Sequence, residues 1–261
     1  MNDLTIIIPV HKYDENVKEL LSRALNSVPE NVPLIISANF NVTSDLSDWI
    51  VNKDTRIVPS ESTSFCSLVN NAVKEVTTKW FSILEFDDTY SKIWMNEVDK
   101  YIKFKPDVSV FMCLEDLVDD QDKKFIGYGN EAVWASSFSN ELGYVDYDCL
   151  QNFFDFYMTG SVFNKEDWDS VGGLKESMKL TFWYEFLLRL THNNKKVFVI
   201  PRVGYTHYLN REGSLINEYA KTMTKMESDG WINIAKQEHF FKNDRNKVYE
   251  PSEEEKTNGQ G

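Results

Sequence analysis

Short apolar runs alternate with helix-like stretches along the first 114 residues of this 261-residue chain. The run from Leu4 to Val10 is apolar nearly throughout, which is typical of a strand covered on both faces. Further runs follow at 34–38, 56–58, 80–84 and 108–114, and the stretches between them repeat apolar residues at helical spacing. This alternation predicts an α/β domain with a mainly parallel central sheet flanked by helices.

The run from Trp80 to Leu84 ends abruptly in three carboxylates, Glu85, Asp87 and Asp88. Open α/β sheets bind ligands at the carboxyl ends of their strands. Clustered carboxylates repel one another unless a cation neutralises them, and hard oxygen ligands suit Mg²⁺ or Mn²⁺. The cluster therefore predicts a divalent-cation site that holds a diphosphate. A solvated acidic turn at the start of the next helix is the alternative.

Charge and cysteine usage narrow the class of protein. The formal net charge of −13 argues against a surface that attracts nucleic acid or an anionic membrane. Cys66, Cys113 and Cys149 are widely spaced and belong to no Cys/His cluster, as expected of reduced thiols. No apolar stretch approaches about 18 residues, and the N-terminus lacks the features of a signal peptide. We therefore expect a cytoplasmic protein without a transmembrane segment.

Four motifs, in chain order, resemble those of the family 2 glycosyltransferases of the GT-A fold. The first is the opening strand, Thr5 to His11, and the second is a helical segment, Leu68 to Ala72, without the family's arginine. The third is Glu85 to Asp88, which is similar to the family's Asp-x-Asp-Asp metal motif with glutamate in first position. The fourth is an acceptor-side segment within 159–189. The resemblance spans about residues 4 to 215.

This resemblance implies a single GT-A (Rossmann-like) α/β domain. Residues 1–114 would form its nucleotide-sugar-binding half. Residues 115–250 would form the acceptor-side half and a C-terminal helical segment. The last residues, 251–261, are charged and lack apolar side chains, which predicts a disordered tail.

The resemblance also implies transfer of a sugar from a nucleoside diphosphate sugar, with a UDP-sugar favoured, to a hydroxyl group with inversion. Mn²⁺ or Mg²⁺ would bridge the diphosphate, held by Asp87 and, at the C-terminal side, by His207. The expected donor-binding residues are Pro9, Val10, His11, Asn39, Asn70, Glu85, Phe86 and Arg211. The expected acceptor-binding residues are Gly160, Trp183 and Tyr184.

An inverting transfer needs a carboxylate that deprotonates the acceptor hydroxyl. The family usually places it in a Glu-Asp pair, but the aligned residues here are Phe182 and Trp183. We expect Glu185 to act as the base instead, with Asp88 as a second catalytic residue that supports the site. The alternatives are a helical ion pair between Glu185 and Arg189, a base at Asp167, Asp169 or Glu176, or a retaining enzyme that needs no such base.

Each of the remaining candidates also has a plainer interpretation. His207 is a hydrogen-bonded structural residue unless it binds the cation. Arg211 lies either on the diphosphate, as a bidentate clamp, or in a surface turn. Asn70 either contacts the donor or holds its helix in place. Trp183 and Tyr184 either stack on a sugar or belong to the core.

The acceptor could be a glycan, a lipid-linked sugar, a protein or a modified nucleobase, and the negative charge makes nucleic acid the least favoured of these. A sugar-nucleotide hydrolase or a nucleotidyltransferase is a second possibility. The absence of a Gly-rich phosphate loop and of a Walker-type lysine argues against it. A catalytically degenerate GT-A fold that binds carbohydrate or acts as a scaffold is the third, because the family's base pair is missing.

Overall fold

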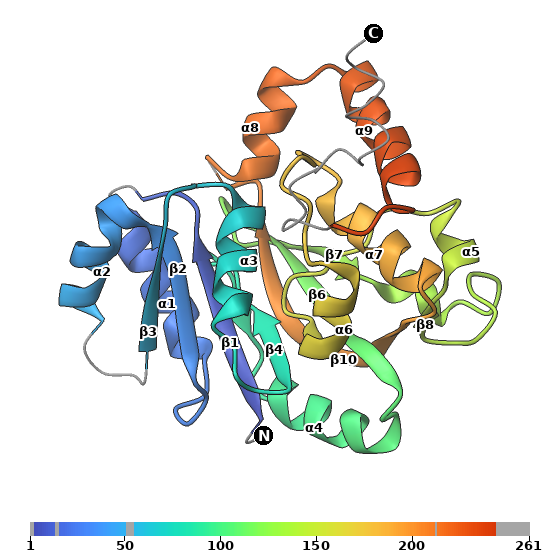
Figure 1. Ribbon diagram of the computed structural model, residues 1–261, viewed down its shortest axis with the longest axis horizontal. Helices are drawn as coiled ribbons and strands as arrows, with labels where there is room; N and C mark the ends of the chain where they lie inside the picture. Colours follow the sequence, from blue (N-terminus) through green and yellow to red (C-terminus); the bar gives the residue numbers. More distant parts are fainter. Residues whose placement is uncertain (1–2, 14–15, 51–54, 212, 244–261) are drawn as a thin grey trace, which may run out of the picture.

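A ten-stranded sheet runs through the centre of the fold in the computed structural model, which describes residues 3–13, 16–50, 55–211 and 213–243 (Figure 1). Its strands are β1 (Leu4–Val10), β2 (Leu34–Asn39), β3 (Thr55–Ser60), β4 (Trp80–Ile83), β5 (Thr89–Tyr90), β6 (Val108–Asp119), β7 (Phe125–Gly129), β8 (Tyr144–Val145), β9 (Val162–Asn164) and β10 (Lys196–Leu209). The main path follows the order β3-β2-β1-β4-β9-β6-β10-β5, with β7 on β6 and β8 on β10.

The helices lie on both faces of this sheet. They are α1 (Val17–Ser27), α2 (Thr43–Trp49), α3 (Phe65–Lys74), α4 (Trp94–Phe104), α5 (Tyr147–Leu150), α6 (Lys165–Val171), α7 (Phe182–His192), α8 (Leu215–Thr222) and α9 (Lys225–Glu238). Two short 3₁₀ turns, Phe40–Val42 and Glu131–Trp134, complete the described elements.

The first half of the sheet is parallel, as the sequence predicts. Strand β1 pairs in parallel with β2 and β4, and β2 pairs in parallel with β3. Successive side chains of β1 point to opposite faces. Ile7 belongs to one core together with Val69 of α3, whereas Ile8 belongs to a second core together with Leu21 of α1. The fully apolar β1 is therefore explained by burial on both faces, and the predicted α/β class is confirmed.

Two strands of the second half are longer than their apolar runs indicate. We expect strands at 108–114 and 196–201, but β6 continues to Asp119 and β10 continues to Leu209. The two strands pair in parallel along their length, and the register shifts between Ile200 and Val203. That irregularity accommodates Pro201, which has no N–H for a regular ladder. The extension of β10 brings its polar end to the acidic loop after β4.

The C-terminal segment forms two helices where the sequence predicts one between 218 and 241. Helix α8 ends at Thr222, and Thr224 begins α9 with a capping box in which Thr224 and Glu227 bind each other's backbone N–H. In Figure 1 both helices lie beyond the end of the sheet where β10 finishes. The predicted tail, 251–261, lies outside the described residues. No helix in the described part of the chain is long and apolar enough to cross a membrane.

Candidate active site

The backbone N–H groups of the acidic loop that follows β4 are bound by residues of two other strands, β1 and β10. Leu84 N–H donates to the carbonyl of Ile7 on β1 at 2.9 Å. Glu85 N–H donates to the hydroxyl oxygen of Tyr205 on β10 at 3.0 Å. The chain turns sharply here, so that ligand atoms of Glu85, Asp87 and Asp88 all lie within 4.8 Å of one another. The expected clustering of the three carboxylates is therefore present.

Asp88 is bound by the end of β10. Its Oδ2 lies 2.9 Å from Nδ1 of His207, and its Oδ1 accepts a hydrogen bond from the backbone N–H of Tyr208 at 2.9 Å. Both carboxylate oxygens are thus occupied, and the residue is almost completely buried. Asp88 fixes the position of His207 relative to the acidic loop, which is a supporting role.

Asp87 is bound by two arginines from distant parts of the chain. Nε and Nη2 of Arg211 lie 2.7 and 2.6 Å from the same oxygen, Oδ2. Arg23 of α1 donates from Nη2 to the backbone carbonyl of Asp87. The guanidinium of Arg23 lies 3.8 Å from the centre of the Tyr208 ring and 3.7 Å from Asp120. Arg23 therefore ties α1, the acidic loop and the end of β10 together.

The cluster is electrostatically strained without a cation. Burial and the charges of Asp87 and Asp88 raise the pKa of Glu85 to about 8. Burial and Asp88 also raise the pKa of Asp87. Burial alone would lower the pKa of His207, but the charge of Asp88 and its hydrogen bond to the ring outweigh burial and raise that pKa to about 10.

The residues present fit a divalent cation. Oδ1 of Asp87 is buried, and no described residue forms a hydrogen bond with it. A buried carboxylate oxygen without a partner is costly, and a hard cation would satisfy it. Glu85 and Asp87 would hold the cation from the loop, with His207 beside them. Such a cation supplies positive charge where a phosphate leaving group becomes negative.

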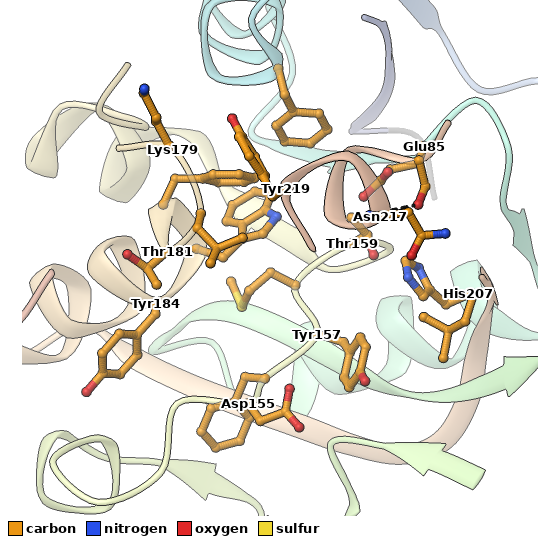
Figure 2. A pocket seen from close by; sticks show the side chains of 18 of the residues that line it. Glu85, Asp155, Tyr157, Thr159, Lys179, Thr181, Tyr184, His207, Asn217 and Tyr219 are labelled. Atoms are coloured by element: carbon orange, nitrogen blue, oxygen red, sulfur yellow. Dashed lines mark hydrogen bonds between the residues drawn. The ribbon is translucent and has the colours of Figure 1, made fainter. Parts of the chain in front are cut away.

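A cavity of about 460 Å³ opens beside the acidic loop. Glu85 and His207 line one end, whereas Asp155 and Tyr184 lie at the opposite end (Figure 2). Much of the wall between them is aromatic or aliphatic, formed by Phe65, Phe156, Met158, Leu180, Phe182, Trp183, Tyr219 and Ile232. The cavity thus combines an anionic end with an apolar wall suited to the face of a ring.

His11 lines the same cavity directly after β1. Its ring packs edge-on against Phe86 and Phe65, with centroids 5.2 and 6.2 Å apart. Burial, reinforced by the positive charges of Arg211 and Lys12, lowers the pKa of His11 to about 4. Neither ring nitrogen has a hydrogen-bond partner among the described residues. A neutral imidazole offers one donor and one acceptor, so His11 can recognise a polar ligand.

No protein-family model matches the chain, and no curated protein matches it. Solved structures do match. TarS 1–349 from S. aureus, in complex with UDP-GlcNAc, is 12% identical, has a TM-score of 0.61, and the match covers 91% of this chain and 72% of that chain. The mannosyltransferase PcManGT from Pyrobaculum calidifontis, in complex with GDP-Man and Mn²⁺, is 12% identical with a TM-score of 0.58, covering 92% and 70%.

The chain has the GT-A fold. Within this GT-A fold, six of the predicted site residues line the cavity: His11, Glu85, Asp87, Trp183, Tyr184 and His207. Arg211 does not face a diphosphate in this state, because it is bound to Asp87. The alternative of a solvated acidic turn is wrong, since Asp87 and Asp88 are buried.

Four of the residues that are predicted to bind the donor do not line the cavity. Pro9, Val10 and Phe86 are buried and do not line the cavity. The Asn39 side chain accepts from the N–H of Asn41 and donates to a carbonyl in the next loop, away from the cavity. The prediction of direct donor contact is therefore not supported at these four positions.

Asn70 and Gly160 are also structural in the GT-A fold. The Asn70 side chain donates to the carbonyl of Leu174 and accepts from its N–H, both at 2.9 Å, which joins α3 to the turn before α7. Gly160 is buried, and its carbonyl accepts from the indole N–H of Trp94 at 2.8 Å. Its φ of +75° and its closeness to Tyr205 explain the glycine better than acceptor binding does.

Glu185 is not placed to be a base. Its carboxylate is fully buried and binds Arg189 through Nε at 2.9 Å and Nη2 at 2.8 Å. Lys175 lies 3.3 Å from the same carboxylate. Glu185 does not line the cavity, and it forms the ion pair with Arg189 that is the alternative to a catalytic role. Asp167 and Asp169 are bound to Lys195 and Lys165 and do not line the cavity either.

Three residues near the site are not predicted from the sequence. Tyr205 precedes His207 by two positions, so period-2 spacing along a longer β10 would have placed both on one face. Glu115 lies opposite Tyr205 on β6, and burial raises its pKa well above the usual range. No described residue hydrogen-bonds with the Glu115 carboxyl oxygens. Arg23 gives no signal in the sequence, because it looks like any polar position on an amphipathic helix.

Proposed function

We propose that this protein is a metal-dependent glycosyltransferase that moves a sugar from a nucleoside diphosphate sugar, preferentially a UDP-sugar, to a hydroxyl acceptor. The observation that supports this most is the unpartnered Asp87 oxygen in a carboxylate cluster at one end of the cavity. The GT-A fold adds weight, because TarS is bound to UDP-GlcNAc and PcManGT is bound to GDP-Man and Mn²⁺.

The side chains at the anionic end have distinct roles in this proposal. Asp87 and Glu85 hold Mn²⁺ or Mg²⁺, with His207 as a further ligand. Bound there, the cation stabilises the charge that develops on the leaving diphosphate. Asp88 keeps His207 in place through the hydrogen bond between them. His11 offers its free ring nitrogens to the donor.

The apolar wall is proposed to receive the acceptor. Trp183 lines it at the start of α7, and its indole packs against Phe65 with centroids 6.1 Å apart. Tyr184 is almost completely buried and donates its hydroxyl to the carbonyl of Leu150, so it belongs mainly to the core. An aromatic face such as that of Trp183 stacks on the C–H face of a sugar ring. Among the acceptors that the sequence leaves open, a glycan or a lipid-linked sugar therefore fits the wall better than a protein or a modified nucleobase.

Inversion stays a prediction. The start of α7 presents Phe182 and Trp183 to the cavity where the resemblance places a Glu-Asp pair. Glu85, Asp87 and Asp155 are the carboxylates among the described residues that line the cavity, and the first two belong to the acidic cluster. Asp155 lies at the far end of the cavity from Glu85 (Figure 2).

The presence of Phe182 and Trp183 at the positions expected for the base favours a second candidate function. This is a GT-A domain that binds a nucleotide sugar without turning it over. Such a domain keeps the metal and donor contacts but needs no base. It predicts metal-dependent donor binding with no release of nucleoside diphosphate. A sugar-nucleotide hydrolase would instead release nucleoside diphosphate without any acceptor.

The experiment is a thermal-shift screen of nucleoside diphosphates and nucleotide sugars, each with Mn²⁺, Mg²⁺ or EDTA, followed by a nucleoside diphosphate release assay. Ligands that bind the folded state raise the melting temperature by mass action. We expect a shift for one UDP-sugar that EDTA abolishes, and release that depends on an added glycan acceptor. A shift without release under any acceptor would support the binding domain. No metal-dependent shift with any donor would reject both.

A further inference from the structure

The guanidinium of Arg211 occupies the same carboxylate that is proposed to bind the cation. Two of its nitrogens lie within 2.7 Å of Oδ2 of Asp87, and the two side chains are only 10% and 8% exposed. Oδ1 of the same carboxylate is the buried oxygen without a described partner. One oxygen of Asp87 therefore already has a cationic partner, and the other is available to a second cation.

A divalent cation on Oδ1 would lie close to the Arg211 guanidinium. Like charges at such separation repel strongly when water is largely excluded, and salt screens buried charges only weakly. Glu85 and Asp88 offset part of this repulsion with their negative charges. The cation and Arg211 thus both depend on the negative charge of the Asp87 carboxylate, and each weakens the binding of the other to it.

The backbone of Arg211 is held independently of the contact between its guanidinium and Asp87. The Arg211 carbonyl accepts hydrogen bonds from Ser214 N–H at 3.1 Å and from the Asn217 side chain at 2.8 Å. Both contacts belong to the start of α8, where the Ser214 side chain caps the helix. The position of the Arg211 backbone is therefore fixed by contacts that do not involve its guanidinium.

We propose that Arg211 is an exchangeable counterion of Asp87. In the donor-free protein it neutralises Asp87 and keeps cation affinity low. When the cation arrives together with a nucleoside diphosphate, Arg211 exchanges the carboxylate for the diphosphate oxygens, which a guanidinium binds in the same forked geometry. Cation and donor then bind cooperatively because of Arg211. This inference rests on the proposed function, since it assumes that Asp87 holds the cation.

The test measures Mn²⁺ binding to the full chain by electron paramagnetic resonance, with and without UDP. Arg211→Gln removes the competing charge, so Mn²⁺ should bind about tenfold more tightly without UDP. With Mn²⁺ saturating, UDP should bind about tenfold more weakly to the same variant, because the diphosphate loses its guanidinium. Arg211→Lys keeps the charge but not the fork, and should fall between the two proteins.

Arg202→Gln is the matched control, because it removes the same charge from an exposed side chain of β10, 59% accessible, outside the cavity. It should change neither affinity. Equal Mn²⁺ affinity in wild type and Arg211→Gln would overturn the exchange and leave the glycosyltransferase proposal standing. Weaker binding of both ligands to a folded Arg211→Gln protein would also overturn it, since Arg211 would then be only a positioning residue. Absence of Mn²⁺ binding in every protein, wild type included, would reject the metal site itself.

Discussion

Asp87 differs from the carboxylates beside it in having one oxygen bound and one oxygen free. Each oxygen of Asp88 already has one described partner, His207 for Oδ2 and the backbone N–H of Tyr208 for Oδ1. The free oxygen of Asp87 is buried. Of the two aspartates in the acidic motif, we therefore expect Asp87 to be a ligand of the cation and Asp88 to be a support.

Asp87→Asn should weaken Mn²⁺ binding by more than about 100-fold, because loss of a direct ligand costs more than loss of a supporting contact. The amide keeps the size of the side chain, so the circular dichroism spectrum should stay unchanged. Electron paramagnetic resonance of free Mn²⁺ checks the affinity. Asp155→Asn changes a carboxylate at the other end of the same cavity and should bind Mn²⁺ normally. Normal binding by Asp87→Asn would remove Asp87 from the site.

Glu185→Gln should lower the free energy of unfolding by about 3 kcal/mol, because it leaves two buried cations short of their carboxylate. Turnover by the folded fraction should be close to that of wild type. Chemical denaturation and initial rates at low temperature separate the two effects. Asp169→Asn, whose side chain is 54% exposed, should cost less than about 1 kcal/mol. A stable but inactive Glu185→Gln protein would restore the catalytic role.

His11 makes stability depend on pH. Its pKa is about 4 in the folded protein against an ordinary value of 6.5, so the unfolded chain binds more protons between these values. The contribution of His11 is complete above pH 6.5 and is lost as the pH falls toward 4, by about 3 kcal/mol in total. Urea denaturation of wild type and His11→Gln across this range should show the wild type losing more stability. Parallel curves would mean that His11 is solvated.

At the scale of elements, the sequence predicts best where an apolar run and a strand coincide. Strand β1 and the acid-bearing strand β4 fall where the runs place them. The far ends of β6 and β10 do not, because their stability comes from pairing with each other along polar stretches. Pairing between distant segments has no local signature. For the same reason, the residues that bind the acidic loop from β10 were only partly predicted.

The segment from Gly160 into β9 supports the acidic loop through Tyr205. A Cβ added to Gly160 would lie 2.4 Å from a ring carbon of Tyr205, at a φ of +75°. Gly160→Ala should therefore destabilise the fold by more than about 2 kcal/mol and should displace the hydroxyl that binds Glu85 N–H. Chemical denaturation measures the cost. Gly127→Ala meets no atom within 4 Å and serves as the control. Equal stability of the two variants would contradict the argument.

The helix α7 shows why the expected catalytic base, Glu185, lies away from the cavity. Its first turn faces the cavity with Phe182 and Trp183, and the next acidic residue, Glu185, points into the core. Two positions along a helix rotate a side chain by more than half a turn, so an acid near the expected position does not replace one at it. The ion pair between Glu185 and Arg189, which the i, i+4 spacing gives as the alternative, is present in the structure.

At the scale of the whole molecule, the site is assembled from both predicted halves of the chain. The acidic loop comes from the first half, and His207 and Arg211 come from the second. The division at residue 114 therefore stays a prediction about substrate binding, since the anionic end of the cavity depends on both parts. The fold class follows from the sequence because it depends on local periodicity. The counterions of the acids do not, since they depend on contacts across the sheet.

This arrangement also has a consequence for synthesis. The contacts of Asp88 with His207 and of Asp87 with Arg211 span 119 and 124 residues. At typical translation rates the ribosome needs on the order of ten seconds to add that much chain. Throughout that interval Arg23 has been made, but the acids lack His207 and Arg211, the cations that bind their carboxylates. The nascent chain must keep the loop in water until β10 arrives, so the binding site can close only after nearly the whole domain has been made.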